Sequence, residues 1–337
     1  GIVYCLSRKK VEELAETLSL AEVRIVPGHG VFNPARLRVL QADLRAGHFD
    51  LLQTYLTYAN ILGSLAGKLA GVPVVASLRS AGVDQRHYHP LRFLLEGFSL
   101  RYLAHGVLAN GYAIADYHQK RAGQQPIKVI PNAVPLFPVL SAEERASVRR
   151  ELVGERSGAL VISVGRLSAP KGYLDLIQAF AEALKKFPTA SLVIVGGGGM
   201  EAEIRARLRA LNLESSVFLT GAREDIPRLL GASDLYVSAS HWEGMSVALL
   251  EAMSAGLPVI ATAVGDAPRM VTPENGLLVQ PKQPAELSQA IQSLLADPAR
   301  MQSMGQSGRE RVARDYSLQA WTDAFLAYYA AMIAKKY

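Results

Sequence analysis

The chain has 337 residues, of which 50% are hydrophobic and 20% charged, and this length exceeds what one hydrophobic core usually serves. The composition excludes intrinsic disorder and collagen-like repeats, and the single cysteine, Cys5, excludes a disulfide-stapled scaffold and indicates a reducing compartment. The net charge of +6 lies wholly within residues 1–140, where it indicates either an anionic partner or solvated helix faces.

The sequence was also searched for membrane-spanning, signal-peptide and nucleic-acid-binding patterns. It contains no run of about eighteen apolar residues and no signal-peptide layout. We therefore expect a cytoplasmic protein, with peripheral contact to the anionic inner face of the membrane as an open alternative. Zinc-finger spacing, helix-turn-helix signals and aromatic-rich basic motifs are missing from the sequence, so we expect no nucleic-acid partner.

Short β-branched runs alternate with amphipathic stretches along the first half, which is typical of βαβ units with parallel sheets. Helices are expected at Pro34–Ala46 and Ala59–Ala70. The expected strands are Ile2–Leu6, Val23–Val26, Leu51–Gln53, Val72–Ser77, Gly106–Ala109 and Lys128–Ile130.

A second series of the same kind begins near residue 160, after a connector that holds Pro131, Pro135 and Pro138. Its expected strands are Leu160–Val164, Ser191–Val195, Val217–Thr220, Leu235–Val237, Pro258–Thr262 and Gly276–Val279. Its expected helices are Tyr173–Lys186, Met200–Leu211, Ile226–Ala232, Val247–Ala255, Pro284–Ala296 and a last one at Leu318–Ile333. The sequence therefore predicts two doubly wound α/β domains, at 1–138 and 139–315, followed by a C-terminal helix within 316–337 that packs back on the first domain.

The loop after the first strand of the second series carries two cations. Gly165 and Arg166 follow the strand, and Lys171 precedes the helix that opens at Tyr173. Cationic side chains beside the free amides of a helix N-terminus suit a diphosphate, although a basic loop that is merely solvated has the same appearance.

The next strand runs into four consecutive glycines, Gly196–Gly199, which permit either close approach to a ligand or a flexible turn. Their spacing is not that of a dinucleotide-binding fingerprint. No Gly-Lys-Ser/Thr ending follows them, so the segment is not a P-loop either.

Two carboxylates flank the start of a later helix. Glu243 precedes a turn at Gly244, Ser246 can cap the helix, and Glu251 follows within an apolar stretch. A diphosphate at the helix terminus, with Glu243 and Glu251 accepting hydrogen bonds from sugar hydroxyls, explains this placement. The alternative is two solvated acids on a surface helix.

At this point the sequence resembles a known family. The segments VGRLSAPKG (Val164–Gly172) and EGMSVALLEAMSAGLPVIAT (Glu243–Thr262), with the glycine cluster between them, resemble the retaining glycosyltransferase family 4 of GT-B architecture. The resemblance covers residues 158–300 and, more loosely, 50–135. It implies two Rossmann-like domains that face a cleft, the second of which binds a nucleotide-sugar and the first an acceptor.

Carried over residue by residue, the resemblance implies roles for particular side chains. Arg166 and Lys171 would clamp the donor diphosphate, Glu243 would contact the donor sugar, and Glu251 would bind the ribose hydroxyls. Further donor-binding groups would be Gly165, the amides of Gly244, Met245, Ser246 and Val247, and the loop that ends at Ile226, which would border the nucleobase.

The mechanism that the resemblance implies needs no protein nucleophile, because the donor phosphate takes the acceptor proton. No Asp-x-Asp motif or His/Cys cluster suggests a divalent cation, so we expect a metal-independent enzyme without a cofactor. A glycosidase would use Glu243 and Glu251 as an acid and a second carboxylate, but the basic clamp would then have no role.

The sequence departs from the family pattern in the first half. Gly1–Cys5 resembles the family's second strand, so the first βα unit is expected to be missing. Arg79 stands where the family often has a histidine and is the candidate on the acceptor side. The stretch 86–101, which includes His87 and His89, is interpreted as a core helix with a basic outer face, and an interfacial helix on anionic lipid stays the alternative.

The sequence analysis therefore favours a glycosyltransferase that moves a hexose from a UDP-sugar, or less favourably a GDP-sugar, to a saccharide or lipid-linked acceptor in polysaccharide or glycolipid synthesis. Alternatives are a nucleotide-sugar-binding partner with impaired catalysis, a nucleotide-sugar epimerase of the same fold, and a phosphorylase, for which no pyridoxal-phosphate lysine is identified.

Overall fold

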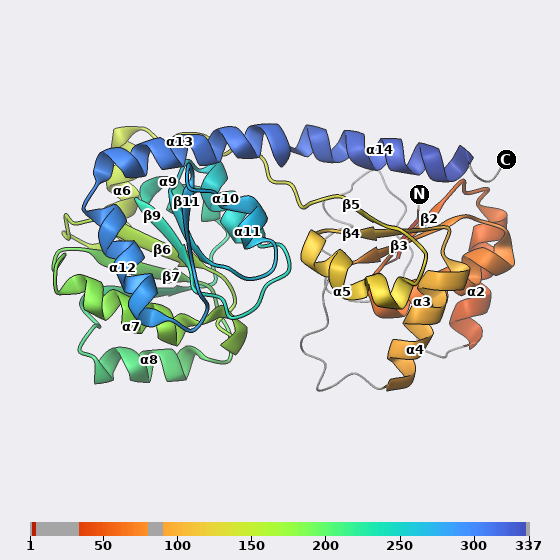
Figure 1. Ribbon diagram of the computed structural model, residues 1–337, viewed down its shortest axis with the longest axis horizontal. Coiled ribbons are helices and arrows are strands. Elements are labelled where there is room, and N and C mark those ends of the chain that lie inside the picture. Colours follow the sequence, from red (N-terminus) through yellow and green to blue (C-terminus); the bar gives the residue numbers. More distant parts are fainter. Residues whose placement is uncertain (1, 5–33, 80–89, 335–337) are drawn as a thin grey trace. The chain divides into compact units, whose positions relative to one another are not determined.

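The structure is a computed structural model that describes residues 2–4, 34–79 and 90–334, and it forms two compact units (Figure 1). Unit 1 comprises Gly1–Pro131 and Thr322–Tyr337, and unit 2 comprises Asn132–Trp321. The expected strand at Val23–Val26, and the basic residues Arg86, His87 and His89, lie outside the described residues. None of the helices in the described ranges is long and apolar enough to cross a bilayer.

Unit 1 is built around a parallel sheet whose described strands lie in the order β1-β2-β3-β4-β5. Helices connect these strands, as parallel neighbours require. The strands are β1 (Ile2–Tyr4), β2 (Leu52–Tyr55), β3 (Val74–Leu78), β4 (Gly106–Ala109) and β5 (Ile127–Val129). The helices are α2 (Pro34–Ala46), α3 (Thr57–Ala70), α4 (Pro90–Phe98), the π-helical turn η2 (Ser99–Leu103) and α5 (Tyr112–Ala122).

The last helix, α14 (Leu318–Ala334), begins in unit 2 and returns to unit 1. There the Tyr328 hydroxyl donates to the Val107 carbonyl oxygen at 3.5 Å, and the Tyr329 hydroxyl donates to Oε1 of Gln53. A Cβ at Gly106 would lie 2.4 Å from the Tyr328 hydroxyl oxygen, so the absence of a side chain at Gly106 lets α14 lie directly on β4.

Unit 2 holds a six-stranded parallel sheet in the order β11-β10-β9-β6-β7-β8. The chain moves from β6 toward β8 and then crosses back to β9 on the other side of β6, so the sheet is doubly wound. The strands are β6 (Leu160–Val164), β7 (Ser191–Val195), β8 (Val217–Gly221), β9 (Leu235–Ser238), β10 (Val259–Thr262) and β11 (Gly276–Val279). The helices are α6 (Ala142–Val153), η3 (Ala169–Lys171), α7 (Tyr173–Leu184), α8 (Glu201–Ala210), α9 (Ile226–Ala232), α10 (Val247–Ser254), α11 (Ala267–Met270), α12 (Pro284–Leu295) and α13 (Pro298–Asp315).

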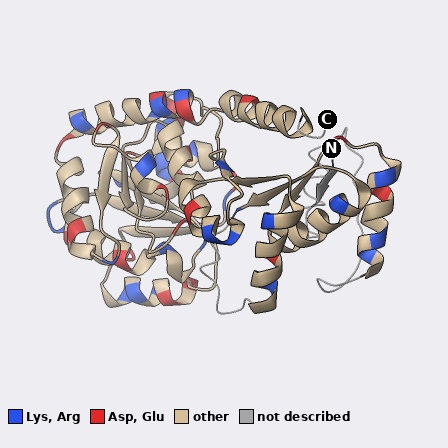
Figure 2. Ribbon diagram, turned by 45° about the vertical axis from the view of Figure 1, so that its right-hand side comes forward, with Lys and Arg blue, Asp and Glu red and all other residues tan. Residues whose placement is uncertain are grey.

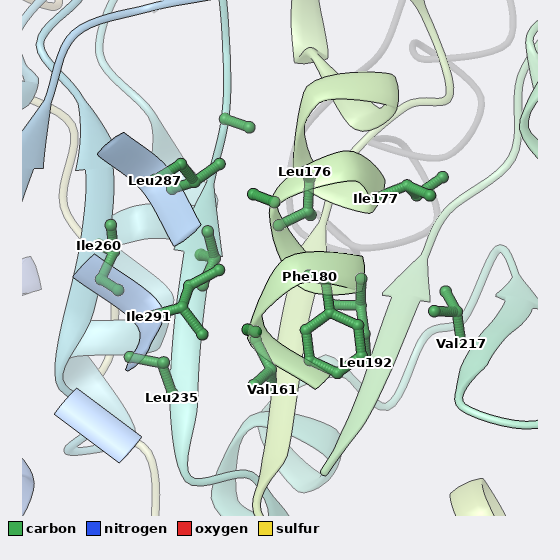
Figure 3. Packing of buried hydrophobic residues seen from close by; sticks show 14 of the residues in the cluster. Val161, Leu176, Ile177, Phe180, Leu192, Val217, Leu235, Ile260, Leu287 and Ile291 are labelled. Atoms are coloured by element: carbon green, nitrogen blue, oxygen red, sulfur yellow. The ribbon is translucent and has the colours of Figure 1, made fainter. Parts of the chain in front are cut away.

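The core of unit 2 lies on both faces of this sheet. Successive strand residues alternate between the faces, so Val161 and Leu192 meet Phe180 of α7 in one cluster, while Leu160 and Val193 belong to the other. Figure 3 shows the first cluster, where α7 and α12 cover the sheet. Burial on both faces explains why these strands are continuous apolar runs. The predicted fold class, two Rossmann-like parallel α/β domains, is confirmed.

Candidate active site

The topology of unit 2 itself singles out one position on the sheet. β6 and β9 are hydrogen-bonded neighbours, but the chain leaves their carboxyl ends in opposite directions, toward β7 and toward β10. Open α/β sheets bind ligands at such a switch point. The two loops that part there are residues 165–172, after β6, and residues 239–246, after β9, and together they hold most of the predicted donor site.

Close backbone contact fixes the first loop against its neighbours. Gly172 has φ of 64° and ψ of 27°, and a Cβ there would lie 2.0 Å from the Ala239 carbonyl oxygen. A Cβ at Gly196, after β7, would lie 2.0 Å from the carbonyl oxygen of Gly165. Glycine at these positions therefore allows three strand-end loops to meet, and the glycine run contributes to packing as well as to turning.

Lys171 and Glu243 meet across the two loops. Lys171 Nζ lies 2.5 Å from Glu243 Oε1, and the Ser240 hydroxyl donates to the same oxygen at 2.8 Å. Ser240 is itself fixed, because Thr262 Oγ1 donates to its carbonyl oxygen at 2.5 Å. The two charged side chains keep part of their surface exposed, 25% for Lys171 and 16% for Glu243, so a ligand can reach both.

A second link joins the same two loops. Nε2 of His241 lies 2.7 Å from Oδ2 of Asp175, which stands in the first turn of α7, and the His241 amide donates to the Pro170 carbonyl oxygen at 2.7 Å. With the Lys171–Glu243 pair and the contact at Gly172, these links hold the start of α7 against the loop after β9. The sequence analysis did not identify this pair.

Helix α10 begins directly after the Glu243 loop. Ser246 is its N-cap, with the side chain accepting from the Leu249 amide at 3.4 Å, as predicted. The Met245 carbonyl oxygen accepts from Asn132 Nδ2 at 3.3 Å, and the Gly244 carbonyl oxygen accepts from the Asp266 amide at 2.9 Å. The backbone amides at the start of the helix, through Val247, have no hydrogen-bond acceptor within the helix, so they can donate to a ligand.

Two buried tyrosines lie beneath the carboxylates. The Tyr173 hydroxyl donates to the Gly165 carbonyl oxygen at 2.9 Å, and burial followed by the charge of Glu243 raises its pKa. Tyr236 of β9 is completely buried; burial, then Tyr173, Glu243 and Glu251, raises its pKa. The charges of Glu243 and Glu251 therefore both act on Tyr236. Burial also raises the pKa of the Glu251 carboxyl.

Three predicted residues make no side-chain contact with the Lys171–Glu243 pair among the described residues. Arg166 lies on the same loop as Lys171, after β6, and is exposed. Ile226 opens α9 at the end of the loop after β8, where Arg223 is bound to Asp225 and to Glu151 of α6 at 2.7 Å each. Arg79 belongs to unit 1, at the carboxyl end of β3, with its guanidinium 4.9 Å from the centre of the Tyr55 ring.

No three His, Cys, Asp or Glu side chains of the described ranges are grouped as the ligands of a metal ion would be. The positive groups on the two loops at the switch point are Lys171, the exposed Arg166 and the start of α10.

Comparison with known proteins finds similar proteins over most of the chain. The family model described as "Glycosyl transferases group 1" matches residues 145–311, and the model "Glycosyltransferase Family 4" matches residues 2–136. A 2-deoxystreptamine glucosyltransferase of Streptomyces kanamyceticus is 29% identical over 307 residues, covering 85% of this chain and 79% of the relative. An Escherichia coli galactosyltransferase named UDP-Gal:alpha-D-GlcNAc-diphosphoundecaprenol alpha-1,3-galactosyltransferase is 28% identical over 303 residues, covering 87% and 78%.

Solved structures show the same architecture. HepE of Anabaena, crystallised with UDP, has a TM-score of 0.85 at 23% identity and covers 95% of this chain and 89% of its own. The sucrose-phosphate synthase of Thermosynechococcus elongatus has a TM-score of 0.76 at 26% identity, covering 92% and 81%. With family models that match nearly all of residues 2–311 and glycosyltransferase relatives across most of its length, the chain belongs to the GT-B glycosyltransferases of the family 4 type.

Proposed function

We propose that the protein transfers a hexose from a UDP-sugar to a saccharide or lipid-linked acceptor with retention of configuration at the anomeric carbon. Unit 2 holds the donor and unit 1 the acceptor, with Arg79 on the acceptor side. The observation that carries the proposal is the Lys171–Glu243 pair at the switch point, 2.5 Å apart and directly ahead of the first turn of α10.

The donor diphosphate binds beside Lys171 and the N-terminus of α10. Lys171, Arg166 and the amides of Gly244–Val247 bind its oxygens, and they stabilise the negative charge that grows on it as the sugar departs. Electrostatic stabilisation by these groups is a role that a divalent cation fills in other transferases, so we propose a reaction that needs no metal. Retention of activity in EDTA tests that part.

Glu243 orients the sugar by accepting hydrogen bonds from its hydroxyls. Its charge is balanced by Lys171, so a carboxylate beside a diphosphate is tolerated. Glu251 accepts from the ribose hydroxyls. In the transfer, the bond from the anomeric carbon to the diphosphate oxygen breaks, the acceptor oxygen attacks from the same face, and the acceptor proton moves to a diphosphate oxygen.

The proposed donor and the proposed role in polysaccharide or glycolipid synthesis rest on the similar proteins. HepE is crystallised with UDP-glucose, and the E. coli relative is named for UDP-Gal and a diphosphoundecaprenol acceptor. A GDP-mannose-dependent mannosyltransferase of Corynebacterium glutamicum is also similar, at 33% identity over 190 residues, which keeps GDP-sugars as the less favoured donors. We propose polysaccharide or glycolipid synthesis on the cytoplasmic side of the membrane.

The first prediction concerns donor turnover. Lys171→Ala and Glu243→Gln should each lower kcat/KM for UDP release from the preferred UDP-sugar about a hundred- to a thousandfold, because each removes a preorganised polar contact. The assay incubates the full chain with a panel of UDP- and GDP-sugars and measures the free nucleotide, with and without acceptor.

Lys185→Ala and Glu182→Gln are the matched controls, since this exposed pair at the C-terminal end of α7, 2.6 Å apart, has the same chemistry away from the site. Both controls should behave like the parent. Parent-like kcat/KM in Lys171→Ala and Glu243→Gln would contradict the site. Nucleotide binding without release in the parent would indicate a binding protein, and a changed sugar still attached to UDP would indicate an epimerase.

A further inference from the structure

Helix α4 and the π-helical turn η2 place apolar side chains on the outside of unit 1. Leu91, Leu94, Phe98 and Tyr102 are 50%, 70%, 53% and 64% exposed, at spacings of three and four residues that align them on one face. The rings of Phe98 and Tyr102 are in contact, with centroids 5.1 Å apart. We call these four residues the α4 stripe.

The acidic side chain of the same segment, Glu96, points inward instead. Glu96 is buried, and its Oε2 lies 2.6 Å from Nη2 of Arg121 on α5. The Arg121 guanidinium also lies 3.5 Å from the centre of the Phe93 ring, and it donates to the Phe93 carbonyl oxygen at 3.2 Å. The segment is thus anchored to α5 through its charged side, which fixes the apolar side outward. This orientation is opposite to the core helix with a basic outer face that the sequence favoured.

The charge around the α4 stripe is positive. Glu96 is the only acidic residue in α4 and η2, all of whose residues are described, and its charge is matched by Arg121. Arg101, beside Tyr102, is exposed and donates to the carbonyl oxygens of Lys120 and Arg121 at 2.7 Å each. All of the net positive charge of the chain falls within residues 1–140, and blue residues are spread over the helices of unit 1 in Figure 2.

We propose that the α4 stripe docks the protein on an anionic lipid surface. Leucine, phenylalanine and tyrosine side chains enter the boundary between headgroups and acyl chains, while the basic surroundings attract the anionic headgroups. A second copy of the chain fits less well, because pairing two stripes would bring two positively charged units together. This docking builds on the proposal that the acceptor is lipid-linked, but it does not depend on the donor chemistry.

The experiment measures sedimentation of the full chain with vesicles. The parent should bind vesicles of phosphatidylcholine and phosphatidylglycerol, should bind pure phosphatidylcholine more weakly, and should be released by salt. The double variant L94Q/F98Q should lose about tenfold or more in affinity, because two large apolar groups no longer enter the bilayer. L69Q/L326Q changes two exposed leucines of unit 1 outside the α4 stripe and should bind like the parent.

Three outcomes would overturn the proposal. One is equal binding by the parent and L94Q/F98Q, another is a parent that stays in solution with both vesicle types, and the third is a parent dimer that L94Q/F98Q converts to monomers. UDP release from a UDP-sugar in free solution is measured on the same samples and should not change in L94Q/F98Q. Release without vesicle binding rejects only the docking, and vesicle binding without release rejects only the proposed transfer.

Discussion

Glu251 is the carboxylate whose ionisation the surrounding protein opposes. It stands on α10, its charge acts on the buried Tyr236, and burial raises its own pKa from the ordinary value of 4.5. A carboxyl with a raised folded-state pKa keeps its proton more tightly in the folded chain than in the unfolded one. The free energy of unfolding therefore falls as the pH rises from about 4.5 through the folded pKa.

A Glu251→Gln variant should lose this penalty. We expect a higher Tm than the parent at neutral pH and no such gain at about pH 3, where both states of the parent carry the proton. We also expect weaker binding of the nucleotide, because the ribose contact is lost. Thermal unfolding across pH and UDP titration measure the two effects, with Glu203→Gln on the exposed face of α8 as the control. An equal gain at both pH values would mean that the ionisation of Glu251 is not the cause.

At the scale of elements, the site depends on how closely α7 approaches the loop after β9. Three links hold this approach: the Lys171–Glu243 pair, the His241–Asp175 pair, and the contact of Gly172 with the Ala239 carbonyl oxygen. The first two are side-chain pairs that a donor could loosen. The third is a backbone contact, and it sets the distance that the other two span.

Gly172→Ala tests that distance, and the chain offers a matched control in Gly71. Both glycines have a left-handed backbone conformation, with φ/ψ of 64°/27° at Gly172 and 73°/22° at Gly71. A Cβ at Gly71 would meet nothing within 4 Å, whereas a Cβ at Gly172 would lie 2.0 Å from the Ala239 carbonyl oxygen. We expect Gly71→Ala to cost about 1–2 kcal/mol of stability from its backbone conformation alone. Gly172→Ala should cost more and should also lower UDP release.

Urea unfolding measures the loss of stability, and the nucleotide-release assay measures the change in UDP release. Equal losses of stability in the two variants, or unchanged turnover in Gly172→Ala, would show that the approach of α7 does not control the site.

At the scale of the whole molecule, the pattern of apolar runs predicted the α/β architecture well, because strands buried on both faces leave a strong signal. The expected strands at Leu160–Val164, Ser191–Val195 and Gly276–Val279 have the bounds that the structure gives. Helix α13 was missed, because Gly305 and Gly308 weaken its helical pattern. The structure supplies the reason for one of them, since a Cβ at Gly305 would lie 2.0 Å from the Gly256 carbonyl oxygen.

Helix α6 was missed although its sequence carries a start signal, the capping box of Ser141 and Glu144. For the site, the sequence supplied Lys171, Glu243 and the cap at Ser246. It did not supply His241 with Asp175, or Tyr236, because these residues meet only through the crossing from β8 back to β9. Spacing along the chain carries no information on such a contact.

The two-unit architecture predicts where a nucleotide acts. UDP should slow hydrogen exchange of the amides in residues 165–172 and at Gly244–Val247, and it should raise the stability of unit 2 with increasing concentration, because it binds the folded form of that unit. The amides of β2, β3 and β4 in unit 1 serve as the internal reference. Slowed exchange in these strands alone would place the nucleotide in unit 1 and contradict the assignment.

Helix α14 gives the chain an order of assembly. Unit 1 is made from two stretches with the whole of unit 2 between them, and its second stretch brings Tyr328 onto β4 and Tyr329 onto Gln53. On a translating ribosome the N-terminal sheet emerges first, but it lacks α14 until the whole of unit 2 has been made. Unit 2, which is continuous in sequence, can complete its fold earlier, so the half made first is the half that matures last.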